Sequence, residues 1–281
     1  MIKWWQGLVL GMLQGLTEFL PVSSSGHLAL AQNLFQGFAQ PGVLFDVALH
    51  LATSVAVVVY FYQDLVSLLK REAGKEAVAM SGSGEMEKLG WSLGWPLIAA
   101  MVPTGVIGFL LKDRVVASFQ KPLFVGIFLL ITALVLFAAD LVFRLRKDAL
   151  LAKDPGLWQS LIIGIAQGLA VFPGISRSGA TIATGIFTGS RGDYAARFSF
   201  LLSVPAVLGA SALSLFKERD ALLGFPAQEL WSYLLGMLAA FIVGYFSIKL
   251  MFLVVKRVRL SWFGIYCAGV GLATVIIMSW R

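Results

Sequence analysis

The sequence predicts an all-α polytopic membrane protein made of two inverted repeats, each a re-entrant helical hairpin followed by three transmembrane helices. Three observations support this fold class. The 281 residues are 58% hydrophobic and only 13% charged, with a mean hydropathy of +0.84. Six apolar segments reach the length of about 20 residues that a helix needs to cross a bilayer. A motif near the start of the chain returns without gaps in its second half.

The composition argues against a soluble domain, in which about 25% of residues are charged. Surface helices of soluble proteins need a polar face, and residues 122–143 (PLFVGIFLLITALVLFAADLVF) have none. The net charge is +7, but its basic residues lie between the apolar segments. Because they form no stripe with interleaved aromatics, no nucleic-acid partner is expected. The single cysteine, Cys267, permits no intrachain disulfide.

The predicted elements alternate between two hairpins and two sets of spans. The hairpins cover 6–36 and 157–190, where short apolar helices flank a break rich in Gly, Pro and Ser. The spans lie near 43–69, 91–111, 122–143, 194–216, 229–254 and 260–280. Each hairpin helix is too short to cross, so each hairpin is expected to enter and leave on one side. Such non-helical backbone is tolerated at depth where protein or a watery cavity surrounds it.

The repeat is visible in the residues themselves. The segment QGLTEFLPVSSSG at 14–26 aligns with QGLAVFPGISRSG at 167–179, and their polar Gln and Ser identities coincide. We therefore divide the single membrane domain, 1–281, into a first repeat at 1–145 and a second at 155–281. With an odd number of spans in each, the repeats are inverted, which predicts a site near the membrane midplane where they meet.

Loop charge predicts the orientation, because cytoplasmic loops carry an excess of Lys and Arg. Twelve basic residues fall on one side, against seven on the side of the first hairpin. The twelve are Lys70, Arg71, Lys75, Lys88, Arg144, Arg146, Lys147, Lys153, Arg191, Lys256, Arg257 and Arg259. The seven are Lys3, Lys112, Arg114, Lys121, Lys217, Arg219 and Arg281. Both termini are thus expected on the outer side of the membrane, with the first hairpin entering from outside.

The first hairpin concentrates polar chemistry. Gln14 and Glu18 lie one helical turn apart on one face, and an ionisable group at membrane depth is a functional candidate. A metal ion, a histidine or an arginine would serve as partner for Glu18; the alternative is a polar residue that stabilises helix packing. Pro21 ends the first half-helix. The following serines, 23–25, suit an N-cap and an anion site, and a cap alone needs only one of them.

The second hairpin supplies a cation. Pro173 and Gly174 break the helix, and Arg177 follows among hydroxyl residues. A guanidinium binds phosphate through two parallel hydrogen bonds, whereas a purely structural arginine would snorkel from a helix end. If the repeats are inverted, the two breaks meet, and Glu18, the serines 23–25 and His27 face Arg177 and its neighbouring hydroxyls. Such a pocket suits phosphate, and with a divalent cation it suits diphosphate best.

Asp46 and His50 open the first full span, four residues apart on one face. They fit two interpretations equally. They either form a second layer around the site, or they are a helix-start Asp and a membrane-interface His.

Together, QGLTEFLPVSSSGH (14–27) and PGISRSGAT (173–181) resemble the undecaprenyl-diphosphate phosphatase family of bacterial membranes, also known for bacitracin resistance. The family's first motif is Glu or Gln, three residues, then Glu, which Gln14 and Glu18 meet. Its Pro-Gly-x-Ser-Arg-Ser-Gly motif is met by Pro173 to Gly179. Length and order of spans agree over the whole chain.

The resemblance implies hydrolysis of undecaprenyl diphosphate to the monophosphate carrier lipid and inorganic phosphate, which recycles the lipid for cell-wall synthesis. It implies Mg²⁺ or Ca²⁺ as cofactor, with Glu18 and Gln14 as candidate ligands. The implied catalytic residues are Glu18, Ser24, His27 and Arg177. The implied phosphate contacts are Ser23, Ser25, Gly26, Ser176, Ser178 and Thr181.

Several alternatives stay open at this stage. The nucleophile is Ser24, His27 or a metal-bound water. Inverted repeats with broken helices also suit a phospholipid flippase or transporter, and a non-catalytic protein that sequesters bacitracin or lipid would bind without releasing phosphate. A homodimer is among the open oligomeric states.

Overall fold

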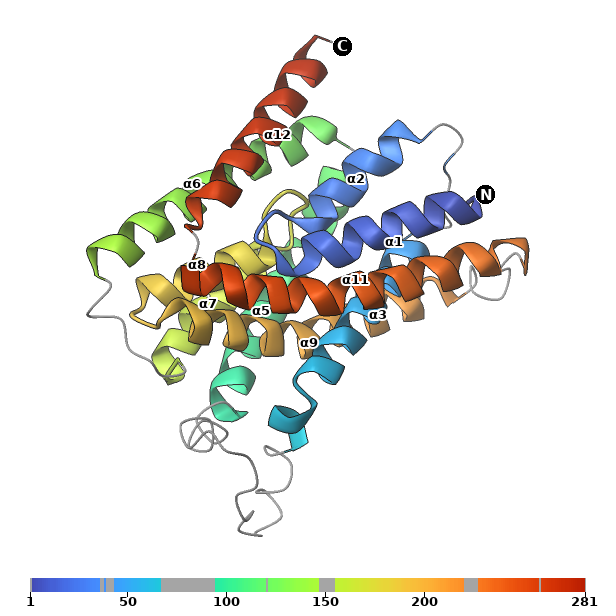
Figure 1. Cartoon of the computed structure of the whole chain (residues 1–281). Helices are drawn as coiled ribbons and strands as arrows, with labels where there is room; N and C mark the ends of the chain where they lie inside the picture. The colour runs from blue at the N-terminus through green and yellow to red at the C-terminus, as the bar shows by residue number, and fades with distance from the viewer. Residues whose placement is uncertain are drawn as a thin grey trace.

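The computed structural model describes residues 2–35, 38, 43–66, 94–119, 121–146, 155–219, 227–257 and 259–280. Over these residues the chain folds into helices (Figure 1), which confirms the predicted all-α class. Several of the basic residues from which the membrane orientation was predicted, those in 70–90 and 147–153, lie outside the described residues.

Both predicted hairpins are helix–break–helix units. The first consists of α1, Trp4–Phe19, and α2, Ser24–Leu34; the second consists of α7, Leu157–Leu169, and α8, Arg177–Phe187. The prolines in the breaks, Pro21 and Pro173, cannot donate a backbone hydrogen bond, so neither helix continues through them. The second helix of each hairpin begins at a serine N-cap: Ser23 accepts from the Gly26 amide and Ser176 from the Gly179 amide.

Five of the six predicted spans are helices long and apolar enough to cross a membrane, among the described residues. They are α5, Gly94–Phe119; α6, Pro122–Leu145; α9, Gly192–Lys217; α11, Leu230–Arg257; and α12, Ser261–Ser279. The predicted span 43–69 contains α3, Leu44–Tyr60, which has 17 residues and is followed by a turn at Phe61 and helical residues 62–66. A short 3₁₀ turn, η2, Ala227–Glu229, precedes α11.

The hairpins are fixed in the bundle by close backbone approaches at glycine. Helix α1 runs along α11 (Figure 1), and α7 packs on α5. A Cβ added at Gly11 would lie 2.1 Å from the Gly236 carbonyl oxygen, and one at Gly164 would lie 2.2 Å from that of Ala100. Small residues at such crossings let helix backbones approach closely, as in membrane bundles.

The outer surface of the bundle is apolar. Trp95 is 77% exposed, Phe109 63% and Leu134 67%, all on helices long enough to span. Soluble monomers rarely expose large contiguous apolar patches, whereas hydrocarbon is a favourable environment for such side chains. Length, hydropathy and this surface together make the chain a multi-pass membrane protein.

Candidate active site

The breaks of the two hairpins lie against each other, as the sequence predicted. The Ser23 hydroxyl accepts a hydrogen bond from the Gly174 amide at 3.1 Å, and the Ser178 hydroxyl donates to the Leu20 carbonyl at 3.1 Å. The approach is close enough that a Cβ on Gly26 would lie 3.0 Å from the Gly174 Cα. Two segments more than 150 residues apart in the chain, by 151 and 158 residues at these two contacts, therefore share one polar centre.

The conformation of the breaks is held by specific hydrogen bonds. Ser23 has φ +69°, the one positive value at a non-glycine residue in the described part of the chain, and such values are uncommon for L-residues. Two amides, those of Gly26 and Gly174, hold its hydroxyl. Thr132 of α6 supports the other break: its hydroxyl donates to the Gly174 carbonyl at 2.9 Å and accepts from the Ser176 amide at 3.0 Å.

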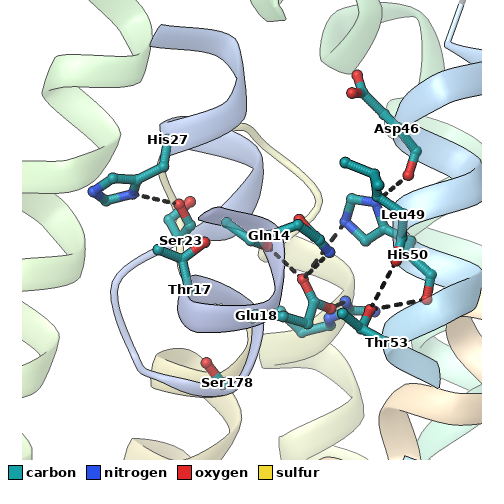
Figure 2. A network of polar contacts seen from close by, with 12 residues as sticks. Gln14, Thr17, Glu18, Ser23, His27, Asp46, Leu49, His50, Thr53 and Ser178 are labelled. Atoms are coloured by element: carbon teal, nitrogen blue, oxygen red, sulfur yellow. Dashed lines mark hydrogen bonds and ion pairs between the residues drawn. The ribbon is translucent and has the colours of Figure 1, made fainter. Parts of the chain in front are cut away.

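Glu18 is the centre of the site, with a side chain only 6% exposed. Its Oε1 pairs with the guanidinium of Arg177 across the two hairpins. Its Oε2 accepts from Gln14 Nε2 at 2.9 Å and from Ser24 Oγ at 2.5 Å. The His50 Nε2 lies 3.6 Å from the same oxygen. Figure 2 shows Glu18 between Gln14 of its own helix and His50 of α3.

These contacts answer the question that the sequence left open about the partner of Glu18. The partner is Arg177, and a buried carboxylate is tolerated because a cation and several donors satisfy it. The Arg177 side chain is itself 23% exposed, so part of the guanidinium faces a small cleft. That cleft is lined by Glu18, Phe19, Arg177, Ser178, Ser199, Phe200 and Ser203.

His27, by contrast, points to the opposite side of the first hairpin from Glu18 (Figure 2). Its Nδ1 lies 2.8 Å from the Ser23 carbonyl and its Nε2 2.8 Å from the Tyr266 hydroxyl. Because a carbonyl only accepts, Nδ1 is the donor, and in the neutral ring Nε2 accepts from Tyr266. The two rings stack with centroids 5.5 Å apart. The structure therefore brings Glu18, Ser24 and Arg177 together, but the prediction that His27 faces Arg177 is wrong, because its two ring nitrogens lie on the Ser23 carbonyl and the Tyr266 hydroxyl instead.

The sequence left two interpretations of Asp46 and His50: a second layer around the site, or a helix-start Asp with a membrane-interface His. The structure supports the first for His50 and the second for Asp46. His50 lies on the Glu18 carboxylate, with its Nδ1 on the Asp46 carbonyl at 2.7 Å. The Asp46 side chain sits in the first turn of α3 and accepts from Gln32 Nε2 at 2.6 Å. Thus His50 joins the site directly, whereas the Asp46 carboxylate turns toward α2.

The other hydroxyls implied as phosphate contacts are mostly engaged within the protein. Ser176 and Ser178 lie 3.2 Å apart, hydroxyl to hydroxyl, and the Thr181 hydroxyl bonds to Ser199 at 2.5 Å. Ser23, Ser176, Ser178 and Thr181 are all at most 5% exposed. Only Ser24 and Ser25 are partly exposed among these hydroxyl residues.

Four residues near the site escaped the sequence reasoning. Ser199 and Ser203 line the cleft, Thr132 supports the second break, and Tyr266 holds His27. A signal existed for the first two: continued in the same gapless register, the repeat sets Asp46 against Ser199 and His50 against Ser203. No pattern in the sequence marked Thr132 or Tyr266.

The fold and the site define a polytopic helical membrane protein with a buried carboxylate–arginine–serine centre at the contact of two broken hairpins. Residues 7–273 match the family described as bacitracin resistance protein BacA. This match covers nearly the whole chain, so the chain belongs to the BacA family.

Full-length relatives agree with this assignment. The undecaprenyl-diphosphatase of Methanosphaera stadtmanae is 41% identical over 278 residues, 96% of each chain. That of Syntrophotalea carbinolica is 45% identical over 260 residues, 92% of this chain and 93% of its own. That of Desulforapulum autotrophicum is 42% identical over 283 residues, 97% of each.

Proposed function

We infer that this protein is an undecaprenyl-diphosphatase, an integral membrane hydrolase that releases phosphate from undecaprenyl diphosphate and leaves the monophosphate. Its product is the carrier lipid of cell-wall synthesis, and its activity confers bacitracin resistance. One observation carries the chemistry: Glu18 bonds at once to the Ser24 hydroxyl and to Arg177. The Glu18 carboxylate can therefore act as a base toward the Ser24 nucleophile while it holds Arg177, the cation that binds phosphate.

In the proposed reaction Arg177 binds the diphosphate in the cleft beside Glu18. To do so it exchanges part of its contact with Glu18 for phosphate oxygens, which a planar guanidinium binds in pairs. Charge that develops on the transferring phosphoryl group then meets fixed donors. The amides at the start of α2 and α8, which meet here, add to the positive potential.

The nucleophile that this geometry favours is Ser24. Its hydroxyl donates to Glu18 at 2.5 Å, the contact through which a carboxylate removes a serine proton. His27 fits the role less well, because the Tyr266 hydroxyl occupies its Nε2. We propose that His27 instead holds the start of α2 in place through the Ser23 carbonyl.

Gln14 and Glu18 are the residues that fit Mg²⁺ or Ca²⁺. A carboxylate only accepts, so the Gln14 amide nitrogen must face Glu18, and the Gln14 Oε1 is left buried without a hydrogen-bond partner. No cluster of three or more His, Cys, Asp or Glu exists among the described residues. The two oxygen donors, the Gln14 Oε1 and the Glu18 carboxylate, suit a hard cation that completes its coordination shell with phosphate oxygens and water. When bound, the ion would neutralise phosphate charge.

We further propose that the halves 1–145 and 155–281 are inverted repeats, with the two hairpins re-entrant. Their packing supports this relation: α1 packs on α11 of the other half and α7 on α5, while α3 pairs with α9 and α6 with α12. In the motif register Gly11 corresponds to Gly164, and each makes the same close approach to a facing carbonyl. The charge asymmetry of the loops supports both termini outside the inner membrane, with the first hairpin entering from outside.

The test is phosphate release from undecaprenyl diphosphate by purified protein in detergent, with and without a chelator. We expect release by the wild-type chain and its loss in Ser24→Ala, Glu18→Gln and Arg177→Ala. A matched control is Thr184→Ala, which removes a hydroxyl bonded only within α8 and should leave the rate unchanged. Rapid quench should trap phosphate on Ser24.

Two other functions make different predictions in the same assay. A flippase would move the lipid across vesicles without releasing phosphate, and a sequestering protein would bind it without turnover. A well-folded wild-type chain that releases no phosphate would contradict the hydrolase assignment, and full activity in Ser24→Ala would contradict the nucleophile.

A further inference from the structure

Ser203 of α9 lines the cleft beside the Glu18–Arg177 pair. The residue is partly exposed, whereas the two other serines that line the cleft, Ser178 and Ser199, are at most 5% exposed. Among the serines of the cleft, Ser203 is therefore the most accessible to a ligand that enters it.

The hydrogen of the Ser203 hydroxyl is available to such a ligand. In the structure it is donated to the Phe200 carbonyl, three residues back on the same helix, at 2.7 Å. The α-helical pattern gives that carbonyl a second donor, the Val204 amide. Pro205 removes the amide that would serve the next carbonyl, that of Leu201, and not this one. A turn of the Ser203 side chain to another staggered position therefore redirects the hydrogen and leaves the Phe200 carbonyl satisfied.

Contacts one helical turn earlier fix the position of Ser203 relative to Arg177. The hydroxyls of Ser199 on α9 and Thr181 on α8 lie 2.5 Å apart, and both residues are at most 3% exposed. Thr181 also lies on the Arg177 carbonyl, at 2.8 Å. Ser203 follows Ser199 by four residues, on the same face of α9. The two helices thus present Arg177 and Ser203 to one cleft.

The cleft needs a neutral donor if it is to hold phosphate. Its two charged side chains, Glu18 and Arg177, pair with each other, so the residues that line it carry no net charge. Ionised phosphate oxygens accept hydrogen bonds, and the Glu18 carboxylate has no hydrogen to give. Phe19 and Phe200, whose rings meet edge to face at 5.4 Å, form the apolar part of the lining. The donors that remain are Arg177 and the hydroxyls, of which that of Ser203 is the accessible one.

We propose that Ser203 is a further phosphate-binding residue, a role that rests on the proposed hydrolase. When the lipid diphosphate enters the cleft, the Ser203 hydroxyl turns away from the Phe200 carbonyl and donates to a phosphate oxygen beside Arg177. This contact forms in the bound substrate and persists in the transition state. It therefore adds affinity and leaves the rate of the chemical step nearly unchanged.

Ser203→Ala tests this role, because it removes a hydroxyl that bonds only within its own helix. The variant loses a hydrogen bond to a charged group, so kcat/KM for undecaprenyl diphosphate should fall about tenfold or more. The loss should lie in KM, with kcat within about threefold of wild type. Ser203→Thr keeps a hydroxyl and should recover most of the lost affinity. The matched control is Ser247→Ala, which removes a hydroxyl bonded within α11, outside the cleft, and should leave KM unchanged.

A Ser203→Ala enzyme with a KM within about threefold of wild type would overturn the inference. A Ser203→Thr enzyme with a KM as high as that of Ser203→Ala would also overturn it, since the hydroxyl would then not be the group that binds. Thermal unfolding in detergent checks that each variant is folded. If the wild-type chain releases no phosphate, the proposed function fails; if wild type is active, Ser24→Ala inert and Ser203→Ala unaffected, only this inference fails.

Discussion

The ion pair between Glu18 and Arg177 makes a prediction about stability as well as about activity. The perturbation is Arg177→Ala, which removes the cation and leaves the carboxylate at 6% exposure with Gln14 and Ser24 as its remaining donors. Removing one partner of a buried ion pair lowers the free energy of unfolding by about 3–5 kcal/mol, because the other charge stays buried without a counter-ion. We expect that range here, because among the described residues no second lysine or arginine pairs with this carboxylate.

The reverse substitution should cost less. Glu18→Gln leaves Arg177 charged, but that side chain is 23% exposed and can turn toward the cleft, so we expect about 1–3 kcal/mol, the cost of unsatisfied hydrogen-bonding groups. The double variant Glu18→Gln, Arg177→Gln removes both charges. It should regain most of the stability lost in Arg177→Ala, because replacing both members of a buried pair is often nearly neutral. Its phosphate release should stay absent.

Thermal unfolding in one detergent measures this series. At about 2–4 °C per kcal/mol for a chain of this size, Arg177→Ala should unfold roughly 6–20 °C lower than wild type. A matched control is Arg191→Ala, whose pair with Asp193 has an arginine 47% exposed and should cost no more than about 1 kcal/mol. Equal unfolding temperatures for wild type and Arg177→Ala, or a double variant less stable than that single one, would refute the reasoning.

Three further substitutions test the supports of the site. Gly11→Ala drives a Cβ into the carbonyl of α11 and should lower the unfolding temperature through a loss of about 1–3 kcal/mol; Gly105→Ala, with open space around it, should not. Thr132→Val removes both hydrogen bonds to the second break and should cost about 1–3 kcal/mol and reduce phosphate release; Thr274→Val, which loses one bond within its own helix, is the control. Tyr266→Phe keeps the stacked ring and loses one neutral hydrogen bond, so kcat should fall less than about tenfold; a loss as large as that of a proton-transfer group would place His27 in the chemistry.

The fold was largely predictable because its determinants are local. The breaks follow from Pro21 and Pro173, which end a helix wherever they occur, and the spans follow from uninterrupted apolar length. The exception is the first span, where the chain turns at Phe61. Nothing in the residues VVVYFYQ at 57–63 marks a stop, since none is glycine or proline.

The site was predictable in part. Glu18 and Arg177 could be paired because a buried carboxylate needs a cation and only one arginine lies in a break. The side of the helix on which each group falls was not predictable. Ser24 and His27 are close in sequence and lie on the same helix, yet Ser24 bonds to Glu18 and His27 to Tyr266. Such directions depend on tertiary contacts that a motif does not encode.

On the proposed duplication, the division of residues between the halves has an electrostatic reason. Two copies of one hairpin that meet tip to tip bring equivalent positions close together, and two buried carboxylates there would repel each other. In the register of the motifs, Val171 stands opposite Glu18 and Arg177 opposite Ser24. One half therefore keeps the acid and the hydroxyl, while the other loses the acid and gains the cation that neutralises it.

The same division extends to the next helices. In the proposed repeat register, His50 on α3 corresponds to Ser203 on α9, and both residues border the Glu18–Arg177 pair. If both were histidine, two bases would flank one carboxylate and one arginine. With serine on the arginine side, the cleft in which phosphate is proposed to bind is bordered by a neutral hydroxyl, and among the described residues His50 is the one imidazole on the Glu18 carboxylate.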